Sequence, residues 1–216
     1  MLLRLVRHGE SEGNFAGSLQ GSRLDTPLSE TGRRQAECLG ARLAGEGIDA
    51  VWASPMIRAR ETSAAVAAVL GLGVLLDPDL VEFDWGAWSG RPYDGEVEKE
   101  VSGVRARWRA GETELSPSGG ESPARAALRA DRFLARLLSS GPRAPLVVAH
   151  GRFNRILMTR LLGRPLSRMD EIRQRNGSLS VFEWDGSHPA APLLLDDISH
   201  LPPELQNVSV LSDSAK

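Results

Sequence analysis

The chain has 216 residues, of which 41% are hydrophobic and 25% are charged, and its formal net charge at pH 7 is -2. This composition is typical of a globular chain with a buried core, and it excludes a disordered, collagen-like or disulfide-stapled protein. The small net charge gives no general attraction to nucleic acid or to an acidic membrane surface. The single cysteine, Cys38, has no partner in the chain for a disulfide bond.

No segment has the length and apolar character of a membrane anchor. The longest uncharged apolar stretch, residues 63–76, is interrupted by two glycines, and a membrane-spanning helix needs about 20 apolar residues. The strand-like run at residues 1–6 is too short for the core of a signal peptide. We therefore expect a soluble, cytoplasmic protein.

Short β-rich runs alternate with helical patterns along the chain. Strands are expected at residues 2–7, 50–53, 73–76, 145–149, 178–184 and 193–198. The apolar pairs at residues 5–6, 75–76 and 147–148 are typical of strands buried on both faces. Helices are expected at residues 31–46, 54–70, 124–138 and 151–162, the second and third opened by Ser54-Pro55 and Ser122-Pro123 as N-cap and first helical residue.

This alternation predicts an α/β fold in which a mostly parallel central sheet is flanked by helices in a three-layer sandwich. Residues 91–120 fit the alternation poorly and are interpreted as a helical insertion over the active-site edge of the sheet. Residues from about 203 to 216 are expected to be a mobile tail. The whole chain, residues 1–216, is expected to form a single domain, and an exposed edge strand near the C-terminus would allow a homodimer.

Charged and polar side chains follow the predicted strands. In an open α/β sheet, ligands bind beyond the carboxyl ends of the strands. Arg7 and His8 follow the first strand, Arg58 lies one helical turn after the second, Glu82 follows the third, and His150 follows the fourth. This set suits phosphoryl transfer, because a neutral imidazole can attack phosphorus, arginine matches phosphate oxygens, and a carboxyl group can move the protons.

The same residues fall into blocks that resemble the histidine phosphatase superfamily, also called phosphoglycerate mutase-like. The blocks are Arg7-His8-Gly9-Glu10-Ser11 with Asn14, the stretch from Asp25 to Gly32, Ser54-Pro55 with Arg58 and Thr62, Glu82 with Gly86, Trp88 and Gly90, Gly119-Gly120-Glu121-Ser122, and His150-Gly151. The resemblance covers roughly residues 2–185. Six blocks in the family's order are a far more specific signal than an isolated Arg-His-Gly.

The resemblance implies a role for each of these residues. His8 is the nucleophile that becomes phosphohistidine, and Glu82 is the general acid and then the base that activates water. Arg7, Arg58 and His150 hold the phosphoryl oxygens, while Asn14 and the backbone of Gly151 help to position the phosphate. The family needs neither a metal nor another cofactor, because the arginines supply the positive charge. The implied substrate is a small phosphomonoester.

Two features depart from the family's pattern. Gln20-Gly21 usually lies two residues before the aspartate that is Asp25 here, and the intervening residues 22–24 would move Gln20 and Gly21 away from the phosphate. Both are kept as candidate substrate-binding residues. The family often has a small residue after the second His-Gly pair, whereas this chain has Arg152. Arg152 either contacts an acidic part of the substrate or is a solvated helix residue.

Other interpretations of these residues remain open. His8, His150 and Glu82 are a donor set that binds zinc elsewhere, although the flanking arginines would repel a cation. The same residues would serve a cofactor-dependent phosphoglycerate mutase, or a non-catalytic module that binds phosphorylated ligands. Trp85 either stacks on a substrate ring or packs in a loop. The run Arg105, Arg107 and Arg109 is interpreted as a solvated helix face.

Overall fold

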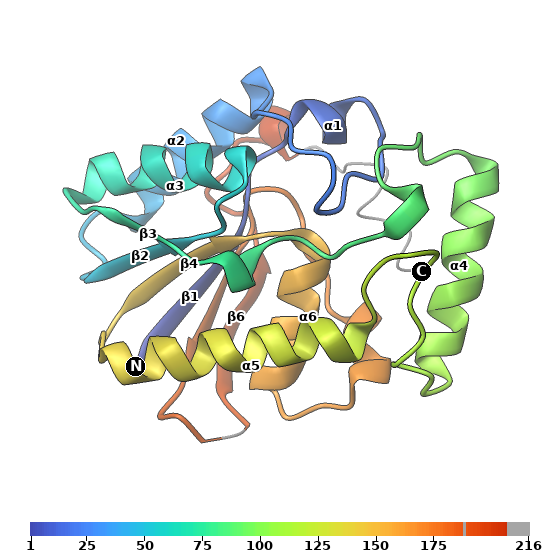
Figure 1. Cartoon of the computed structure of the whole chain (residues 1–216). Coiled ribbons are helices and arrows are strands. Elements are labelled where there is room, and N and C mark those ends of the chain that lie inside the picture. Colours follow the sequence, from blue (N-terminus) through green and yellow to red (C-terminus); the bar gives the residue numbers. More distant parts are fainter. Residues whose placement is uncertain (188, 207–216) are drawn as a thin grey trace.

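The computed structural model describes residues 1–187 and 189–206, and its centre is one six-stranded sheet (Figure 1). In chain order the strands are β1 (Leu2–Arg7), β2 (Ala50–Ala53), β3 (Val74–Leu76), β4 (Pro145–Ala149), β5 (Leu179–Glu183) and β6 (Ala191–Asp197). Across the sheet their order is β3-β2-β4-β1-β5-β6. Neighbours among β1 to β4 pair in parallel, and β5 and β6 pair antiparallel. The predicted mostly parallel sheet is thereby confirmed.

Helices cover both faces of the sheet, as Figure 1 shows. The helices α2 (Glu30–Leu43) and α3 (Ile57–Leu70) share one apolar core with the sheet, and α5 (Pro123–Ser140) and α6 (Gly151–Leu161) share another. Adjacent residues of β1 face opposite layers, since Leu5 belongs to the α5/α6 core and Val6 to the α2/α3 core. Both residues are fully buried, which confirms the α/β three-layer prediction for the central strands.

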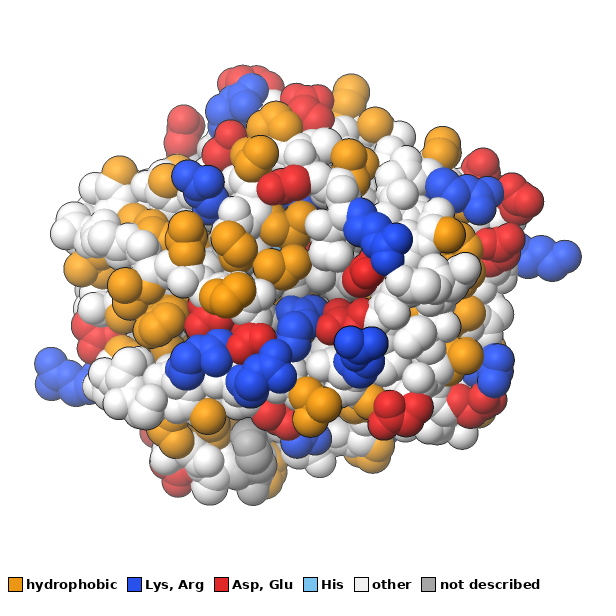
Figure 2. Space-filling model, viewed as in Figure 1, with side chains coloured by type: hydrophobic (Ala, Val, Ile, Leu, Met, Phe, Trp, Pro, Cys, Tyr) orange, Lys and Arg blue, Asp and Glu red, His pale blue; other side chains and the backbone are white. Residues whose placement is uncertain are grey.

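The third strand differs from the prediction of two-sided burial. Leu75 and Leu76 of β3 are 51% and 48% exposed. The reason is the strand order, which puts β3 at the edge of the sheet, where only β2 pairs with it. Figure 2 shows apolar side chains on the surface that α3 and β3 form.

The two serines predicted as helix N-caps, Ser54 and Ser122, have different roles in the structure. Ser122 accepts a hydrogen bond from the backbone N–H of Arg125 and caps α5, as predicted. Ser54 does not cap a helix, because α3 begins at Ile57 after a Met56 N-cap that has no side-chain hydrogen bond. The prediction of a Ser54 N-cap was wrong. The Ser54 hydroxyl instead contacts the ring of His150 at 2.8 Å, so this serine supports a side chain at the end of the neighbouring strand.

The insertion contains one long helix, α4 (Gly95–Arg109), which Figure 1 places beyond the end of the sheet. Its residues Val101 and Trp108 share an apolar core with Phe83 and Trp85. A short helix, α1 (Glu12–Phe15), which was not predicted, follows β1. Every helix in residues 1–187 and 189–206 is too short or too polar to span a lipid bilayer.

Ordered chain continues past the predicted start of the tail. Pro203–Leu205 form a 3-10 turn, and the Gln35 side chain of α2 donates a hydrogen bond to the carbonyl oxygen of Leu205 at 2.8 Å. The Leu205 side chain is buried together with Leu201. The rest of the expected tail, residues 207–216, lies outside the described residues.

Candidate active site

The carboxyl ends of β1 and β4 bring the two predicted histidines together. The two strands are parallel neighbours with Arg7 opposite Ala149, and the backbone N–H of His8 donates to the carbonyl oxygen of Ala149 at 3.0 Å. His8 directly follows β1, and His150 directly follows β4. Their ring centroids lie 5.1 Å apart in an edge-to-face arrangement. The sheet register therefore fixes the imidazole pair.

The His8 ring is held with one nitrogen turned to the backbone and the other toward an arginine. Its Nδ1 lies 2.7 Å from the carbonyl oxygen of Gly9, which can only accept a hydrogen bond, so Nδ1 carries the proton. Its Nε2 is then unprotonated, and the lone pair of this nitrogen accepts a longer hydrogen bond from Arg58 Nε at 3.3 Å. Burial lowers the pKa of His8 well below its usual 6.5, and the charges of Arg58 and Arg7 lower it further. His8 is consequently a neutral imidazole at pH 7.

The His150 ring is fully buried at the N-cap of α6. Its Nε2 lies 2.8 Å from the Ser54 hydroxyl, whereas its Nδ1 has no hydrogen-bond partner among the described residues. Burial lowers the pKa of His150 well below 6.5, and Arg58 adds to this. A buried nitrogen without a hydrogen-bond partner is costly.

Arg7 approaches the first turn of α6 closely. Its Nη1 donates to the carbonyl oxygen of Gln174 at 2.6 Å, and its Nε is buried with no partner in the described part of the chain. Burial lowers the pKa of Arg7 to about 10, although Glu82 opposes the shift. The guanidinium group still carries its charge at pH 7. Gly151 permits the approach, because a Cβ atom there would lie 3.1 Å from Arg7 Nε.

Arg58 is held by the loop that contains Gly21. Its Nη2 donates to the carbonyl oxygen of Gly21 at 3.0 Å, and its Nη1 contacts Leu24 and Asp25 at 3.2 and 3.3 Å. Burial lowers the pKa of Arg58. Residues 22–24 therefore do not carry Gly21 away from the site, because its carbonyl oxygen orients Arg58.

The Glu82 carboxyl group lies at the N-terminus of α6. Its Oε1 accepts hydrogen bonds from the backbone N–H groups of Phe83 at 2.8 Å and Phe153 at 2.9 Å, and its Oε2 accepts one from Arg152 at 3.2 Å. These bonds fix the carboxyl group beside Gly151. Glu82 thus lines the cavity with its carboxyl group bonded to the first turn of α6, the helix that His150 caps.

Asn14 and Gln20 complete the predicted set. Asn14 Oδ1 accepts hydrogen bonds from the Ser11 backbone at 3.2 Å and from the Asn176 side chain at 3.1 Å. The Gln20 amide donates to Ser11 Oγ and accepts from Thr26 Oγ1, each at 2.8 Å. Both residues are buried and line the cavity.

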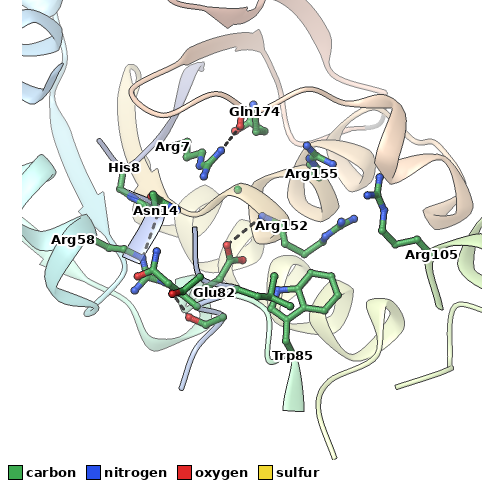
Figure 3. A pocket seen from close by; sticks show the side chains of 15 residues that line it. Arg7, His8, Asn14, Arg58, Glu82, Trp85, Arg105, Arg152, Arg155 and Gln174 are labelled. Carbon is green, nitrogen blue, oxygen red and sulfur yellow. Dashed lines mark hydrogen bonds between the residues drawn. The ribbon is translucent and has the colours of Figure 1, made fainter. Parts of the chain in front are cut away.

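One cavity of about 90 Å³ unites these groups (Figure 3). Nine of the ten predicted residues line it, and His150 lies directly behind them against His8 and Gly151. The lining residues that the sequence did not single out as site residues are Ser18, Leu19, Trp85, Arg105, Arg155 and Gln174. No group of three or more His, Cys, Asp or Glu side chains in residues 1–187 and 189–206 is arranged to hold a metal ion.

Arg152 and Arg105 are both buried, which excludes the solvated alternative for Arg152 and differs from the interpretation of Arg105. Arg152 is only 9% exposed; it pairs with Asp170 and lies over the Trp85 ring at 5.3 Å. Arg105 is 4% exposed and pairs with the same aspartate at 3.0 Å. The solvated-face interpretation was therefore wrong for Arg105, because α4 turns this side chain toward Asp170. Trp85 packs against Phe83 and Trp108, so one of its faces supports Arg152.

Comparison with known proteins gives a family for this chain. The family model of the histidine phosphatase superfamily (branch 1) matches residues 3–197. The chain is 36% identical over 189 residues to a probable phosphoglycerate mutase of Photorhabdus laumondii, with 85% of each chain covered. It is 34% identical over 184 residues to phosphoserine phosphatase 1 of Hydrogenobacter thermophilus, with 85% of this chain and 86% of that protein covered.

A solved structure shares the fold. The alpha-ribazole phosphatase of Shigella flexneri superposes with a TM-score of 0.78 at 29% identity, over 91% of this chain and 96% of that one. The fold and the sequence blocks around His8 and His150 agree with these comparisons. The chain belongs to the histidine phosphatase superfamily (branch 1).

Proposed function

We propose that the protein hydrolyses phosphomonoesters through a phosphohistidine formed at His8, without a metal ion. The observation that carries this proposal is the state of the His8 ring. Its Nδ1 is fixed on the Gly9 carbonyl oxygen, its pKa is lowered by burial, and its Nε2 faces the cavity beside Arg58. A neutral imidazole whose unprotonated nitrogen is held in a fixed orientation is a nucleophile at pH 7.

The positive charges and the free N–H groups around His8 match a phosphoryl group. Arg7 and Arg58 bring two buried guanidinium groups, and His150 brings a ring nitrogen that no described residue bonds. The N-terminus of α6 adds the backbone N–H of Gly151 and the positive end of a helix dipole, while the N–H groups of Arg152 and Phe153 bond to Glu82. These groups stabilise the charge of the transferring phosphoryl group, which is the main requirement of phosphoryl transfer.

The first half of the reaction transfers the phosphoryl group to the enzyme. His8 Nε2 forms a bond to phosphorus as the bond from phosphorus to the alcohol oxygen breaks. Glu82 gives its proton to the departing oxygen, so the alcohol leaves neutral and Glu82 becomes a carboxylate. In the second half the carboxylate takes a proton from water, whose oxygen attacks phosphorus and releases His8. Phosphate leaves, and Glu82 is protonated for the next turnover.

Trapping the intermediate tests this proposal. Acid quenching would destroy phosphohistidine, so the enzyme is mixed with a ³²P-labelled phosphomonoester and quenched at high pH. We expect the label on His8, located by peptide mass spectrometry. His8→Ala should lose the label and lower kcat by roughly three orders of magnitude or more. The matched control is His200→Gln, which removes a histidine that does not line the cavity. This variant should keep both the label on His8 and the wild-type kcat. Unchanged turnover in His8→Ala would overturn the mechanism, and a folded wild type that takes no label would point to a non-catalytic binding module.

A second candidate activity is phosphoglycerate mutation, in which the phosphohistidine returns its phosphoryl group to a bound substrate rather than to water. It is favoured by the 36% identity to the probable phosphoglycerate mutase. The phosphatase names of other relatives favour hydrolysis. Supplying 3-phosphoglycerate and measuring 2-phosphoglycerate and free phosphate together separates the two. We expect phosphate to be the main product, and isomerisation faster than phosphate release would make the protein a mutase.

A further inference from the structure

The cavity continues from His8 along α6 to a group of arginines around one buried aspartate. Asp170, in the 3-10 helix Leu166–Glu171, is 8% exposed. Four guanidinium groups lie within 4 Å of its oxygens, from Arg105 at 3.0 Å, Arg155 at 3.6 Å and Arg109 at 3.7 Å, and from Arg152, which forms the shortest contact. Three of them, Arg105, Arg152 and Arg155, also line the cavity. We call these three the arginine cluster.

Arg152 and Arg155 together carry more positive charge than Asp170 can balance. Within residues 1–187 and 189–206, Asp170 is the only carboxylate in ion-pair contact with Arg152 and Arg155. The two guanidinium groups are 9% and 6% exposed. Burial lowers the pKa of Arg155 to about 9, the charge of Arg152 contributes, and the attraction of Asp170 does not compensate. Buried charges of like sign are unfavourable unless a counter-charge reaches them.

The cluster is held in place before any ligand binds. The Arg152 guanidinium lies over Trp85 at 5.3 Å and near Trp108 at 5.8 Å, while Asp170 holds its other side. Figure 3 shows Arg152, Arg155 and Arg105 on the side of the cavity that faces away from His8 and Arg58. Fixed donors that face a cavity lose little freedom when an anion binds to them.

The position of Glu82 directs the leaving alcohol toward this cluster. Its carboxyl group accepts a hydrogen bond from the Arg152 backbone at 3.2 Å, so a group protonated by Glu82 departs beside Arg152. Arg155 follows Gly151 by one helical turn, which is roughly 6 Å along the axis. A phosphoryl group at His8 and a second anionic group one turn farther along α6 would therefore be held by the same helix.

We propose that Arg105, Arg152 and Arg155 form a second anion subsite, so that the preferred substrates are phosphomonoesters whose alcohol carries another anionic group close to the ester. Carboxylates and second phosphoryl groups share this chemistry, since both match the donor fork of arginine. The inference builds on the proposed phosphatase function and adds the class of its substrate.

A matched pair of substrates tests the subsite. 3-Phosphoglycerate and glycerol 3-phosphate differ by a carboxylate in place of a hydroxymethyl group. We expect kcat/KM to be at least tenfold higher for 3-phosphoglycerate. A second pair, glycerol 2,3-bisphosphate and glycerol 3-phosphate, asks whether a phosphoryl group close to the ester serves as well as a carboxylate. The pair with the larger ratio identifies the preferred anion. Ratios within twofold of one in both pairs would overturn the proposal.

Variants then locate the preference. Arg155→Met and Arg152→Met should each lower the ratio of kcat/KM between acidic and neutral substrate at least tenfold, whereas Arg155→Lys, which keeps the charge, should retain most of it. General damage to the fold lowers both rates and leaves the ratio unchanged. The control Arg160→Met alters the same helix at a 41%-exposed side chain paired with Asp131 and should keep the wild-type ratio. If all four variants keep the wild-type ratio of kcat/KM between acidic and neutral substrate, the arginine cluster does not cause the preference for a second anion.

Binding measurements separate this inference from the proposed function. Calorimetry on His8→Ala compares the Kd values of 3-phosphoglycerate and glycerol 3-phosphate without turnover. If the wild type hydrolyses no phosphomonoester, yet His8→Ala binds 3-phosphoglycerate at least tenfold more tightly and the added Arg155→Met change abolishes the difference, the phosphatase proposal fails and the subsite stands. If the protein hydrolyses phosphomonoesters but neither the rates nor the Kd values depend on the second anionic group, the subsite proposal is wrong and the phosphatase proposal stands.

Discussion

Gly151 lies where the Arg7 guanidinium crosses the first turn of α6. A Cβ atom at this position would lie 3.1 Å from Nε and 3.2 Å from Cζ of Arg7. Arg7 cannot withdraw easily, because it is buried and donates to the Gln174 carbonyl oxygen at 2.6 Å. Gly151→Ala should therefore push Arg7 aside by a few tenths of an ångström and lower kcat/KM by up to about 10-fold, less than the roughly 100-fold that a 1 Å misplacement costs. Steady-state kinetics on the wild type and the variant measure this.

The same substitution should not stabilise the fold, because its Cβ atom meets the buried Arg7 side chain, and this contact opposes the gain of about 0.5–1 kcal/mol that alanine brings over glycine inside a helix. The matched control is Gly103→Ala in α4, where a Cβ atom would meet nothing within 4 Å. Thermal unfolding should give Gly103→Ala a Tm at or above that of the wild type and Gly151→Ala a Tm no higher than that of the wild type, with full activity only in Gly103→Ala. Wild-type kcat/KM in Gly151→Ala would show that Arg7 is free to move.

Sequence blocks predict His8, Arg58 and His150 because each stands at a fixed distance from the end of a strand or the start of a helix. The sheet register then brings His8 and His150 together, and the hydrogen bonds of Arg58 to His8 and Gly21 add the arginine. Asp170 and Arg155 carry no comparable local signal. Their contact arises when the 3-10 helix Leu166–Glu171 packs against α6, and the spacing of charges along the sequence does not report that packing. The interpretation of Arg105 as solvated was wrong for the same reason. Which arginine of α4 is buried depends on the side chains that pack against the helix, here Asp170.

At the scale of elements, one carboxylate joins α4 to the body of the fold. Asp170 pairs with Arg105 of α4 and with Arg152 of α6. Burial alone would raise the pKa of Asp170, but these two arginines outweigh it and hold the pKa far below the ordinary value. Asp170→Asn would leave the buried Arg152 guanidinium group without its counter-charge. We expect the free energy of unfolding to fall by about 3–5 kcal/mol, the usual cost of breaking a buried pair.

Urea denaturation at pH 7 checks this value against a matched surface pair. Asp131 and Arg160 form an ion pair at 2.9 Å with both side chains about 40% exposed, so Asp131→Asn should cost about 0–1 kcal/mol. Amide hydrogen exchange should also increase across residues 95–109 in Asp170→Asn only. A loss for Asp170→Asn as small as that for Asp131→Asn would mean that the arginines find other partners or water.

Strand order limits what apolar runs predict about an element. The run in β3 resembles the runs in β1 and β4, yet Leu75 and Leu76 are half exposed. All three strands have the propensity to join the sheet, and the local sequence says nothing of which strand lies at the edge. The start of α3 shows the same limit, because Ser54 has the local features of an N-cap but bonds to His150 across the sheet.

At the scale of the whole molecule, the buried histidines couple the stability of the fold to pH. Burial lowers the folded-state pKa values of His8 and His150 well below 6.5, while in the unfolded chain both titrate near 6.5. As the pH falls below this value, the unfolded chain binds protons that the folded protein does not bind. The free energy of unfolding must therefore decrease with falling pH, and the contribution of each histidine is complete only above pH 6.5.

Chemical denaturation between pH 8 and 5 measures this dependence. The free energy of unfolding should be nearly constant above pH 7 and should then decrease by up to about 1.4 kcal/mol per pH unit for each histidine. The lowered pKa of Asp170 acts in a more acidic window, because its stabilisation is lost only below the unfolded aspartate value near 3.8. In His8→Asn the slope between pH 6.5 and 5 should be shallower by about the contribution of one histidine. If His8→Asn and the wild type keep equal slopes, folding does not lower the pKa of His8, and the neutral imidazole that the mechanism requires would be lost below pH 6.5.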